Sequence, residues 1–483
     1  CRGHSGAAPA GTGTAVTADG EFSGRRVTVL GFGRREGVSL VHFLCAKGAQ
    51  VLVSDQRQAT ELRESLAAVA GLPLQLDLGG HDDDRILAWG DLICVSPVIP
   101  RSLPLLQAAA QLGIGISSEV ELFFERCPAP ITGITGSAGK TTTTTMLGRM
   151  LEQSGRRVFV GGNIGTPLLG ALQHLKASDA VVMELSSFQL QPMRRSPRGA
   201  VVTNLTPNHL DRHGSMQEYA EAKRQIVAHQ QPADWAVLNA ADPQLQSFAQ
   251  ATSAETAWFS VDPPQQAGDA AFVDGTQVTL RRAGQRRSVA PVAAIRLRGR
   301  HNLENALAAA LAASLAGATD GAIASTLATF NGVEHRLQLL GTLQGARYYD
   351  DSIASTPERL LAALRSFSEP LVVILGGRDK RLPWGEAAEA VCRQCRTVIL
   401  TGEARDLIAE AMAAASERVG RRPAMVTEPR FDEAVSAAMA AARPGDVVLL
   451  SPGCTSFDQF VDFAARGCRF AQLVTAAAEF DKS

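Results

Sequence analysis

A glycine-rich turn that runs into Lys140 and Thr141 constrains this chain more than any other feature of its 483 residues. The turn, Gly-Ser-Ala-Gly at 136–139, follows an apolar stretch typical of a buried strand, and apolar residues at helical spacing come after it. In this order, backbone N–H groups can wrap a phosphate, Lys140 adds a positive charge, and the Thr141 hydroxyl can bind Mg²⁺. Ile134 stands where the strict phosphate-loop pattern has its first glycine. The segment predicts a nucleotide-phosphate site at the start of a helix.

A second apolar run, at 180–184, ends in Glu184. It predicts a buried strand that presents a carboxylate at its carboxyl end. Sites for ATP and Mg²⁺ need such an acid near the phosphate loop. The two elements together favour an enzyme that hydrolyses ATP or transfers its phosphoryl group. A non-catalytic phosphate-loop switch or scaffold is an alternative with the same residues.

Composition and net charge indicate which binding partners and which cellular compartment to expect. The formal net charge is −1, which gives no general attraction to nucleic acid or to an anionic membrane, so we expect small-molecule partners. We also expect a monomer. The eight cysteines are scattered, as in proteins of a reducing cytosol, and we expect a cytoplasmic protein. Cys392 and Cys395 form a lone CxxC with helix-like flanks, and we interpret them as structural thiols. The alanine-rich segment 306–316 predicts a packed helix, because no apolar run is long enough to span a bilayer.

The length leaves room for about three domains. Residues 1–22 lack aliphatic periodicity and predict a disordered tail rather than a signal peptide. The α/β patterns that follow place domains at 23–126, 127–331 and 332–483.

The first domain has the layout of a Rossmann unit. An apolar strand at 27–30 leads into a turn that starts at Gly31, and a second strand ends in Asp55, an acid that could meet a ribose or a base. Glu36 stands in place of the third glycine of GxGxxG, so the dinucleotide signal is weak. An NAD-dependent oxidoreductase is an alternative that rests on this turn alone.

Two more regions have clear patterns. The polar stretch 262–287 predicts short strands and turns within the second domain. In the third domain, apolar strands at 371–375 and 447–450 are each followed by a polar loop. Loops beyond the carboxyl ends of strands bind ligands in open α/β sheets, so the loops 376–380 and 451–456 predict binding residues.

These pieces, in this order, resemble the Mur ligases of peptidoglycan synthesis from about residue 24 onward. Besides the phosphate loop, the motifs are GNIG at 162–165, ELSSFQL at 184–190, NLTPNHLDR at 204–212, GRHN at 299–302, HR at 335–336 and SPGCTSFDQF at 451–460. The ELSSFQ string is typical of the glutamate-adding member. The resemblance implies an α/β fold of three domains: a Rossmann-like N-terminal domain, a central P-loop ATPase-like domain and a Rossmann-like C-terminal domain.

The resemblance also implies an activity. An ATP-dependent ligase would pass the γ-phosphoryl group to the alanyl carboxylate of UDP-N-acetylmuramoyl-L-alanine, and the amine of D-glutamate would attack the acyl phosphate. ATP and Mg²⁺ would be required. A ligase similar to folylpolyglutamate synthase is the nearest alternative within this fold, but the N-terminal nucleotide-binding unit favours a uridine substrate.

Residue roles follow from the same resemblance. The catalytic and metal-binding set is Lys140, Thr141, Glu184, His209 and a carbamylated Lys223. Further ATP contacts are Gly136, Ser137, Ala138, Gly139, Thr142, Asn302, Asn305, Arg336 and Asp351. The uridine nucleotide substrate would contact Gly31, Phe32, Gly33, Arg34, Asp55, Ser96 and Asn163. Glutamate would be held by Lys380, Ser456 and Phe463.

Two positions depart from the family pattern. Ile353 replaces the lysine of an Asp-Ser-Lys motif, which removes a cation from the glutamate region and leaves L-glutamate as an alternative substrate. Val98 replaces the glycine of a Ser-Pro-Gly loop, and a side chain there changes the contacts open to the sugar nucleotide.

Overall fold

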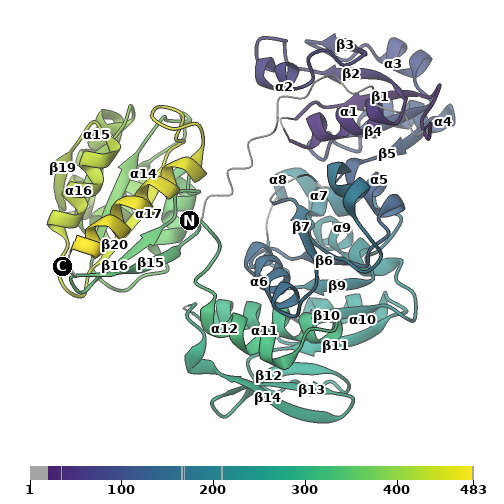
Figure 1. The fold of residues 1–483 in the computed structure, drawn as a ribbon. Helices are drawn as coiled ribbons and strands as arrows, with labels where there is room; N and C mark the ends of the chain where they lie inside the picture. The colour runs from purple at the N-terminus through teal and green to yellow at the C-terminus, as the bar shows by residue number, and fades with distance from the viewer. Residues whose placement is uncertain are drawn as a thin grey trace. The chain divides into compact units, whose positions relative to one another are not determined.

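The computed structural model describes residues 20–33, 35–164, 167, 169–207, 210–297 and 299–480. Three α/β sheets follow one another along the chain (Figure 1). The first two sheets belong to one compact unit that ends at Phe330, and the third belongs to a second unit that begins at Asn331. The α/β class and the three-sheet organisation are as predicted.

The first sheet is fully parallel, in the order β3-β2-β1-β4-β5. Helices α1 and α5 cover one face and α3 and α4 the other. Because the strand order reverses between β1 and β4, a crevice opens at their carboxyl ends, where such sheets bind nucleotides. The strands are β1 (Arg26–Leu30), β2 (Gln50–Asp55), β3 (Leu74–Leu78), β4 (Leu92–Val95) and β5 (Gly115–Ser117), and the helices are α1 (Glu36–Ala46), α2 (Arg63–Ala68), α3 (Asp83–Trp89), α4 (Pro104–Gln111) and α5 (Glu119–Arg126).

The second sheet has nine strands, in the order β14-β13-β12-β11-β10-β9-β6-β8-β7. The strands from β7 to β12 are parallel, and the antiparallel pairs β12–β13 and β13–β14 form the polar excursion predicted from sequence. The strands are β6 (Ile131–Thr135), β7 (Val158–Gly162), β8 (Ala180–Glu184), β9 (Gly199–Val202), β10 (Trp235–Asn239), β11 (Glu255–Phe259), β12 (Ala270–Asp274), β13 (Gln277–Arg282) and β14 (Gln285–Pro291).

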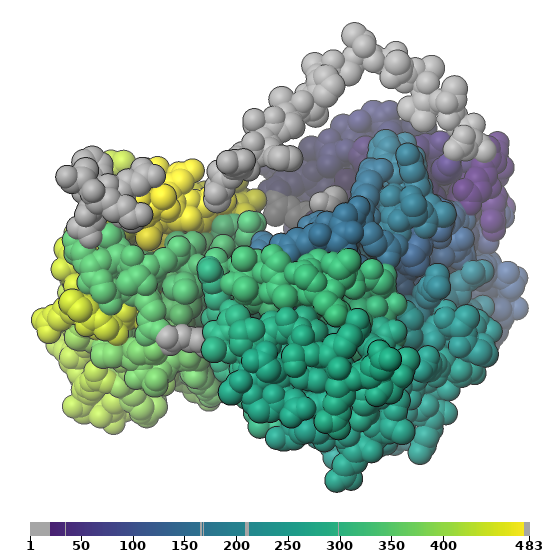
Figure 2. Space-filling view, turned by 60° about the horizontal axis from the view of Figure 1, so that its bottom comes forward, coloured from purple at the N-terminus to yellow at the C-terminus, as the bar shows by residue number. Residues whose placement is uncertain are grey.

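Helices α6 and α11 pack against each other beside this sheet. Alanine makes α11 small enough to be buried on every side, as its sequence predicted. In the space-filling view, the part of the chain from β10 to α12 (teal to green) forms a closely packed surface (Figure 2). The helices are α6 (Lys140–Gln153), η1 (Leu169–His174), α7 (Ser187–Leu190), α8 (Leu210–His213), α9 (Met216–Ala228), η2 (Pro243–Leu245), α10 (Gln246–Gln250), η3 (Val292–Ala294), α11 (Arg300–Leu315) and α12 (Asp320–Thr329).

The third sheet, in the second unit, has the order β15-β16-β20-β17-β18-β19, with β15 antiparallel and the other strands parallel. Helices α13 to α15 cover one face, and α16 and α17 the other. The strands are β15 (Gln338–Leu343), β16 (Ala346–Asp350), β17 (Leu371–Gly376), β18 (Cys395–Thr401), β19 (Ala424–Thr427) and β20 (Val447–Gly453), and the helices are α13 (Pro357–Leu364), α14 (Gly385–Gln394), α15 (Arg405–Val419), α16 (Phe431–Ala441) and α17 (Phe463–Phe480).

One local prediction was wrong. Cys392 lies on α14, but Cys395 is the first residue of β18 rather than part of a helix. Both thiols are free and fully buried, which agrees with a structural role. The helix ends at Gln394 because the apolar, β-branched run after it joins the sheet.

The residues just ahead of β1 pack against the first domain. Residues 1–19 lie outside the described residues, but Phe22 is buried in the first core and Glu21 pairs with Arg126 at 2.6 Å, although the sequence analysis placed both in the tail. No helix within the described ranges is both long and apolar enough to cross a membrane.

Candidate active site

The phosphate loop joins β6 to α6, as its sequence predicted. Gly139 caps α6 with φ +83°, and a Cβ there would lie 3.0 Å from Cγ of Asn305 on α11. A side chain at this position would therefore be strained and would collide with α11. Asn302 lies one helical turn before Asn305 and accepts a hydrogen bond from its amide at 3.3 Å. Asn305 therefore lies at the loop, and Asn302 lies beside Asn305.

Side chains from residues much later in the chain also hold the phosphate loop in place. The backbone N–H of Ala138 donates to Asn204 at 2.9 Å, and Ser137 Oγ lies 3.0 Å from the Tyr219 hydroxyl. The Lys140 ammonium donates back to the carbonyls of Gly136 and Ser137 at 3.0 and 3.2 Å. The loop is therefore ordered by the protein alone. Thr142 follows on α6, and His209 lies outside the described residues.

Glu184 ends β8, which lies beside β6, so the strand register brings its carboxylate to the phosphate loop. The carboxylate is buried, and it accepts hydrogen bonds from Thr141 Oγ1 at 2.7 Å and from Asn163 Nδ2 at 2.9 Å. Among the described residues, no three His, Cys, Asp or Glu side chains cluster as a metal site. Thr141 and Glu184 offer two oxygen donors for a metal at the loop.

Lys223 lies on α9 with its side chain 2 % exposed. Its ammonium donates to Thr135 Oγ1 at 3.2 Å and lies 4.8 Å from the centre of the Tyr219 ring. Burial, followed by the positive charge of Lys140, lowers the pKa of Lys223 well below its usual range, and Glu184 only partly opposes this. The amine is therefore biased toward its neutral form.

A cavity of about 390 Å³ brings these groups together. Lys140, Lys223 and Asn163 line it beside Ser186, Ser187, Phe188 and Gln189 of the ELSSFQL motif. Arg212, Tyr219 and Glu36 complete its polar lining. The Lys140 ammonium, the Arg212 guanidinium and several hydrogen-bond donors suit an anionic substrate.

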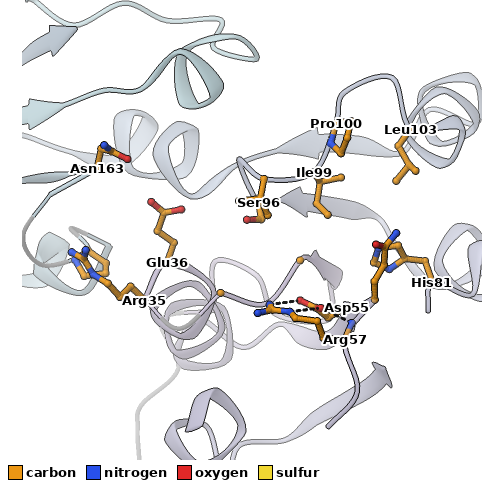
Figure 3. Close-up of a pocket in the computed structure, with 16 residues that line it drawn as sticks. Arg35, Glu36, Asp55, Arg57, His81, Ser96, Ile99, Pro100, Leu103 and Asn163 are labelled. Carbon is orange, nitrogen blue, oxygen red and sulfur yellow. Dashed lines mark hydrogen bonds and ion pairs between the residues drawn. The ribbon is translucent and has the colours of Figure 1, made fainter. Parts of the chain in front are cut away.

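A second cavity, of about 630 Å³, lies at the carboxyl ends of β1, β2 and β4 (Figure 3). Gly31, Gly33, Asp55, Ser96 and Asn163, all predicted for the uridine nucleotide, line it. Phe32 is buried, and its backbone N–H donates to Asp55 at 2.6 Å. Arg34 lies outside the described residues.

Asp55 is held by Arg57, which donates to its two carboxylate oxygens at 2.9 and 2.8 Å. Burial would raise the pKa of Asp55, but the hydrogen bonds from Arg57 and Phe32 outweigh it and keep the pKa below its ordinary value. The acid therefore remains an acceptor at neutral pH.

Val98, the departure from a Ser-Pro-Gly loop, is 65 % exposed and lines both cavities. Its carbonyl accepts a hydrogen bond from Arg212 at 2.8 Å. Since Val98 is not among the residues with positive φ, the loop holds valine without the strain that a glycine conformation would impose.

Arg336 and Asp351 lie in the second unit, close to each other. Asp351 is buried and accepts hydrogen bonds from Ser451 Oγ at 2.8 Å and from the backbone N–H of Leu337 at 3.2 Å. Burial raises the pKa of Asp351 to about 7, and the nearby Arg336 guanidinium opposes this rise.

The three residues predicted for glutamate lie on loops at the carboxyl ends of β17 and β20. Lys380 donates to Ser355 at 3.3 Å, Ser456 is buried, and Phe463 begins α17 with its ring 39 % exposed. The backbone groups of Arg378 and Thr455 bond to each other at 2.9 and 3.0 Å, which ties the two loops together. Ile353 lies on a third loop, where its carbonyl accepts from Arg359 at 3.1 Å.

Sequence reasoning missed several residues that line the cavities, above all Arg35, Glu36, Arg57 and His81. Arg35 and Glu36 are adjacent at the start of α1, Arg57 follows β2 and His81 follows β3, and they have no motif of their own. Arg57 could have been found in the sequence, because it is a cation only two residues after the predicted site residue Asp55.

The three parts of the chain each match a family model. Residues 25–118 match the Mur ligase MurD-like N-terminal domain, residues 134–313 the Mur ligase middle domain, and residues 335–454 the Mur ligase glutamate ligase domain. The chain belongs to the Mur ligase family.

Curated relatives make the likeness more specific. A UDP-N-acetylmuramoylalanine–D-glutamate ligase from Symbiobacterium thermophilum is 43 % identical, over 93 % of this chain and 98 % of its own length. One from Roseiflexus sp. is 39 % identical, over 94 % and 99 %.

Solved structures share the fold. Crystal structures of a UDP-N-acetylmuramate–alanine ligase from Thermotoga maritima and of MurF from Acinetobacter baumannii each give a TM-score of 0.53. The first is 19 % identical, over 94 % of this chain and 100 % of that one, and the second is 18 % identical, over 95 % and 91 %.

Proposed function

We propose that this chain is the ATP-dependent ligase that joins D-glutamate to UDP-N-acetylmuramoyl-L-alanine. The observation that carries the proposal is the pair of adjoining cavities. They share Glu36, Val98 and Asn163, and together they extend from Asp55 in the nucleotide-binding crevice to Lys140 and Lys223 at the phosphate loop. A substrate with a nucleotide at one end and a reacting carboxylate at the other fits this path. The names of the relatives agree with it.

The reaction has two steps. The alanyl carboxylate oxygen attacks the γ-phosphorus of ATP, so the bond to the bridging oxygen breaks and ADP leaves. The amine of glutamate then attacks the acyl carbon, loses a proton, and expels inorganic phosphate as the amide forms. Positioning and charge dominate such a reaction, because the reacting groups all belong to the substrates and the protein has little covalent chemistry to do. Lys140 is the cation that offsets the transferred charge.

Mg²⁺ fits the carboxylate and hydroxyl at the loop. Glu184 and Thr141 offer the hard oxygen donors that Mg²⁺ prefers, and the remaining ligands would come from phosphates and water. When bound, the ion would neutralise phosphate charge. Asn163 orients Glu184 through their hydrogen bond. Lys140 is the first residue of α6, so its charge and the helix dipole serve the same anion.

Lys223 fits a carbamate. Carbon dioxide reacts with a neutral amine, and the lowered pKa of Lys223 favours that form. Addition of CO₂ would replace a buried cation with a carboxylate-like anion beside Lys140. Because Lys223 donates to a threonine hydroxyl and lies near a second cation, Lys140, the modification would also relieve a repulsion.

Glutamate would bind in the second unit. Lys380 could anchor its side-chain carboxylate, with Ser456 and Phe463 beside it, while Arg336 and Asp351 would meet the γ-phosphate and the ribose of ATP. L-glutamate remains a second candidate, because Ile353 leaves this region one cation short of the Asp-Ser-Lys pattern. The relatives named for D-glutamate favour the D enantiomer. Neither an oxidoreductase nor a folylpolyglutamate synthase explains the joined cavities as well.

Isotope transfer tests the mechanism. With oxygen-18 in the alanyl carboxylate, the acyl-phosphate route moves one labelled oxygen into the inorganic phosphate when product forms. Mass spectrometry of the phosphate detects it. Product formation with unlabelled phosphate would exclude the acyl phosphate, and phosphate release without product would reduce the chain to an ATPase.

A further inference from the structure

Glu36 occupies the boundary between the two cavities. It is the first residue of α1, it lines both cavities, and Figure 3 shows its carboxylate on the wall toward Asn163 and Ser96. A substrate that reaches from Asp55 to Lys140 must pass this side chain. Glu36 lies outside the family motifs.

The carboxylate of Glu36 has spare capacity to accept hydrogen bonds. Within the described structure it receives one long bond, from Gln189 Nε2 at 3.3 Å. Burial raises the pKa of Glu36, while Arg35 opposes this. A carboxylate can accept about four hydrogen bonds, so most of its lone pairs face the cavity unused.

A second carboxyl group lies behind Glu36. Glu119, on α5, has Oε1 buried without a hydrogen-bond partner among the described residues. Burial first, and then the charge of Glu36, raise the pKa of Glu119 to about 8. A proton on Glu119 removes the repulsion between the two carboxyl groups.

The order of groups along the substrate decides what meets Glu36. The glycine turn at Gly31 and Gly33 suits the diphosphate, because its backbone N–H groups attract an anion. A carboxylate repels a diphosphate. The next group toward Lys140 is the sugar ring, whose hydroxyls and acetamido N–H are donors.

We propose that Glu36 is a specificity-determining residue that accepts hydrogen bonds from the N-acetylmuramoyl ring of the sugar nucleotide. The assignment rests on the proposed function, since it takes the substrate from it. Gln189, from the ELSSFQL motif, would hold the carboxylate toward the ring through its existing hydrogen bond.

The test compares two ligands by calorimetry on the full chain without ATP. UDP fills the nucleotide part of the path, whereas UDP-N-acetylmuramoyl-L-alanine fills both parts. Glu36→Gln should keep the affinity for UDP within about twofold and lose roughly ten- to hundredfold for the sugar nucleotide, the range for a hydrogen bond to a charged group. Glu36→Ala should lose at least as much. Glu125→Gln, on α5 and outside both cavities, is the control and should bind both ligands like the parent.

Steady-state kinetics supply a second readout. The Michaelis constant for the sugar nucleotide should rise in Glu36→Gln, while those for ATP and glutamate stay unchanged. Equal losses for UDP and the sugar nucleotide, or no loss for either, would overturn the assignment. A parent protein that binds no sugar nucleotide would instead contradict the proposed function.

Discussion

Lys223 is unusual at the residue scale because a buried lysine here bonds to a threonine hydroxyl and neighbours another cation. Removing an ammonium from water is costly unless it is paired or neutralised. Two solutions exist: the amine stays neutral, or CO₂ converts it into an anion that Lys140 and a metal can hold. Both forms follow from the same burial.

Carbon-13 NMR distinguishes these forms. In buffer equilibrated with labelled CO₂, the parent should show a carbamate resonance that is absent from Lys223→Ala. Lys176→Ala, which removes a lysine outside the site, should keep it. Activity of Lys223→Ala should fall to near zero and recover in part with acetate, which replaces the missing anion. A folded parent without the resonance would contradict the carbamate.

Lys380 gives the second prediction at this scale. If its ammonium anchors the side-chain carboxylate of glutamate, Lys380→Ala should raise the Michaelis constant for glutamate about ten- to hundredfold, because a charge-assisted bond of roughly 1.5–3 kcal/mol is lost. The constant for ATP should change little. Arg393→Ala, which removes an exposed cation from α14, is the matched control. Unchanged constants for both glutamate enantiomers would remove Lys380 from the substrate site.

At the scale of elements, the phosphate loop could be predicted from the sequence, but the residues that pack against the loop could not. The Gly-Ser-Ala-Gly-Lys-Thr string defined the strand, the turn and the helix start, because local spacing carries that information. The contact between Gly139 and Asn305 joins segments far apart in the chain, and no local pattern reveals it. Cys395 shows the opposite failure, since a helix-like flank gave way to sheet pairing.

A comparison of alanine substitutions at Gly139 and Gly155 separates the cost of backbone strain from the cost of a steric collision. Both have positive φ, +83° and +82°, but a Cβ at Gly155 would meet nothing within 4 Å. Gly155→Ala should cost about 1–2 kcal/mol of stability from backbone strain alone. Gly139→Ala should cost more and should raise the Michaelis constant for ATP. Urea unfolding and kinetics measure both, and equal losses with unchanged ATP kinetics would remove Asn305 from the loop's support.

Glu119, on helix α5, should make the stability of the protein depend on pH. Its pKa is about 8 in the folded protein against an ordinary 4.5. Between these values the folded state keeps a proton that the unfolded chain releases, so stability falls as the pH rises from about 4.5 to 8. Glu119→Gln should flatten this fall and gain most over the parent near pH 8. Urea titrations at pH 5 and pH 8 that show the same difference for both proteins would contradict the shifted pKa.

At the scale of the whole molecule, the order of the three sheets followed from the sequence, because each begins with a strand and a recognisable loop. The cavities did not. Glu36 on α1, Arg57 after β2, Asn163 after β7 and Gln189 on α7 are far apart in the sequence, and only the folded chain brings them to one path. The departures at Val98 and Ile353 were visible in the sequence, but only the structure shows which residues surround these two side chains.

The most direct measurement is inorganic phosphate release by the purified protein with ATP, UDP-N-acetylmuramoyl-L-alanine and each glutamate enantiomer in turn. A D-glutamate ligase will release phosphate in step with product, only when all three substrates are present, and faster with D-glutamate than with L-glutamate. Preference for L-glutamate would assign the alternative substrate that Ile353 leaves open. Release that does not depend on either glutamate or the sugar nucleotide would contradict a ligase.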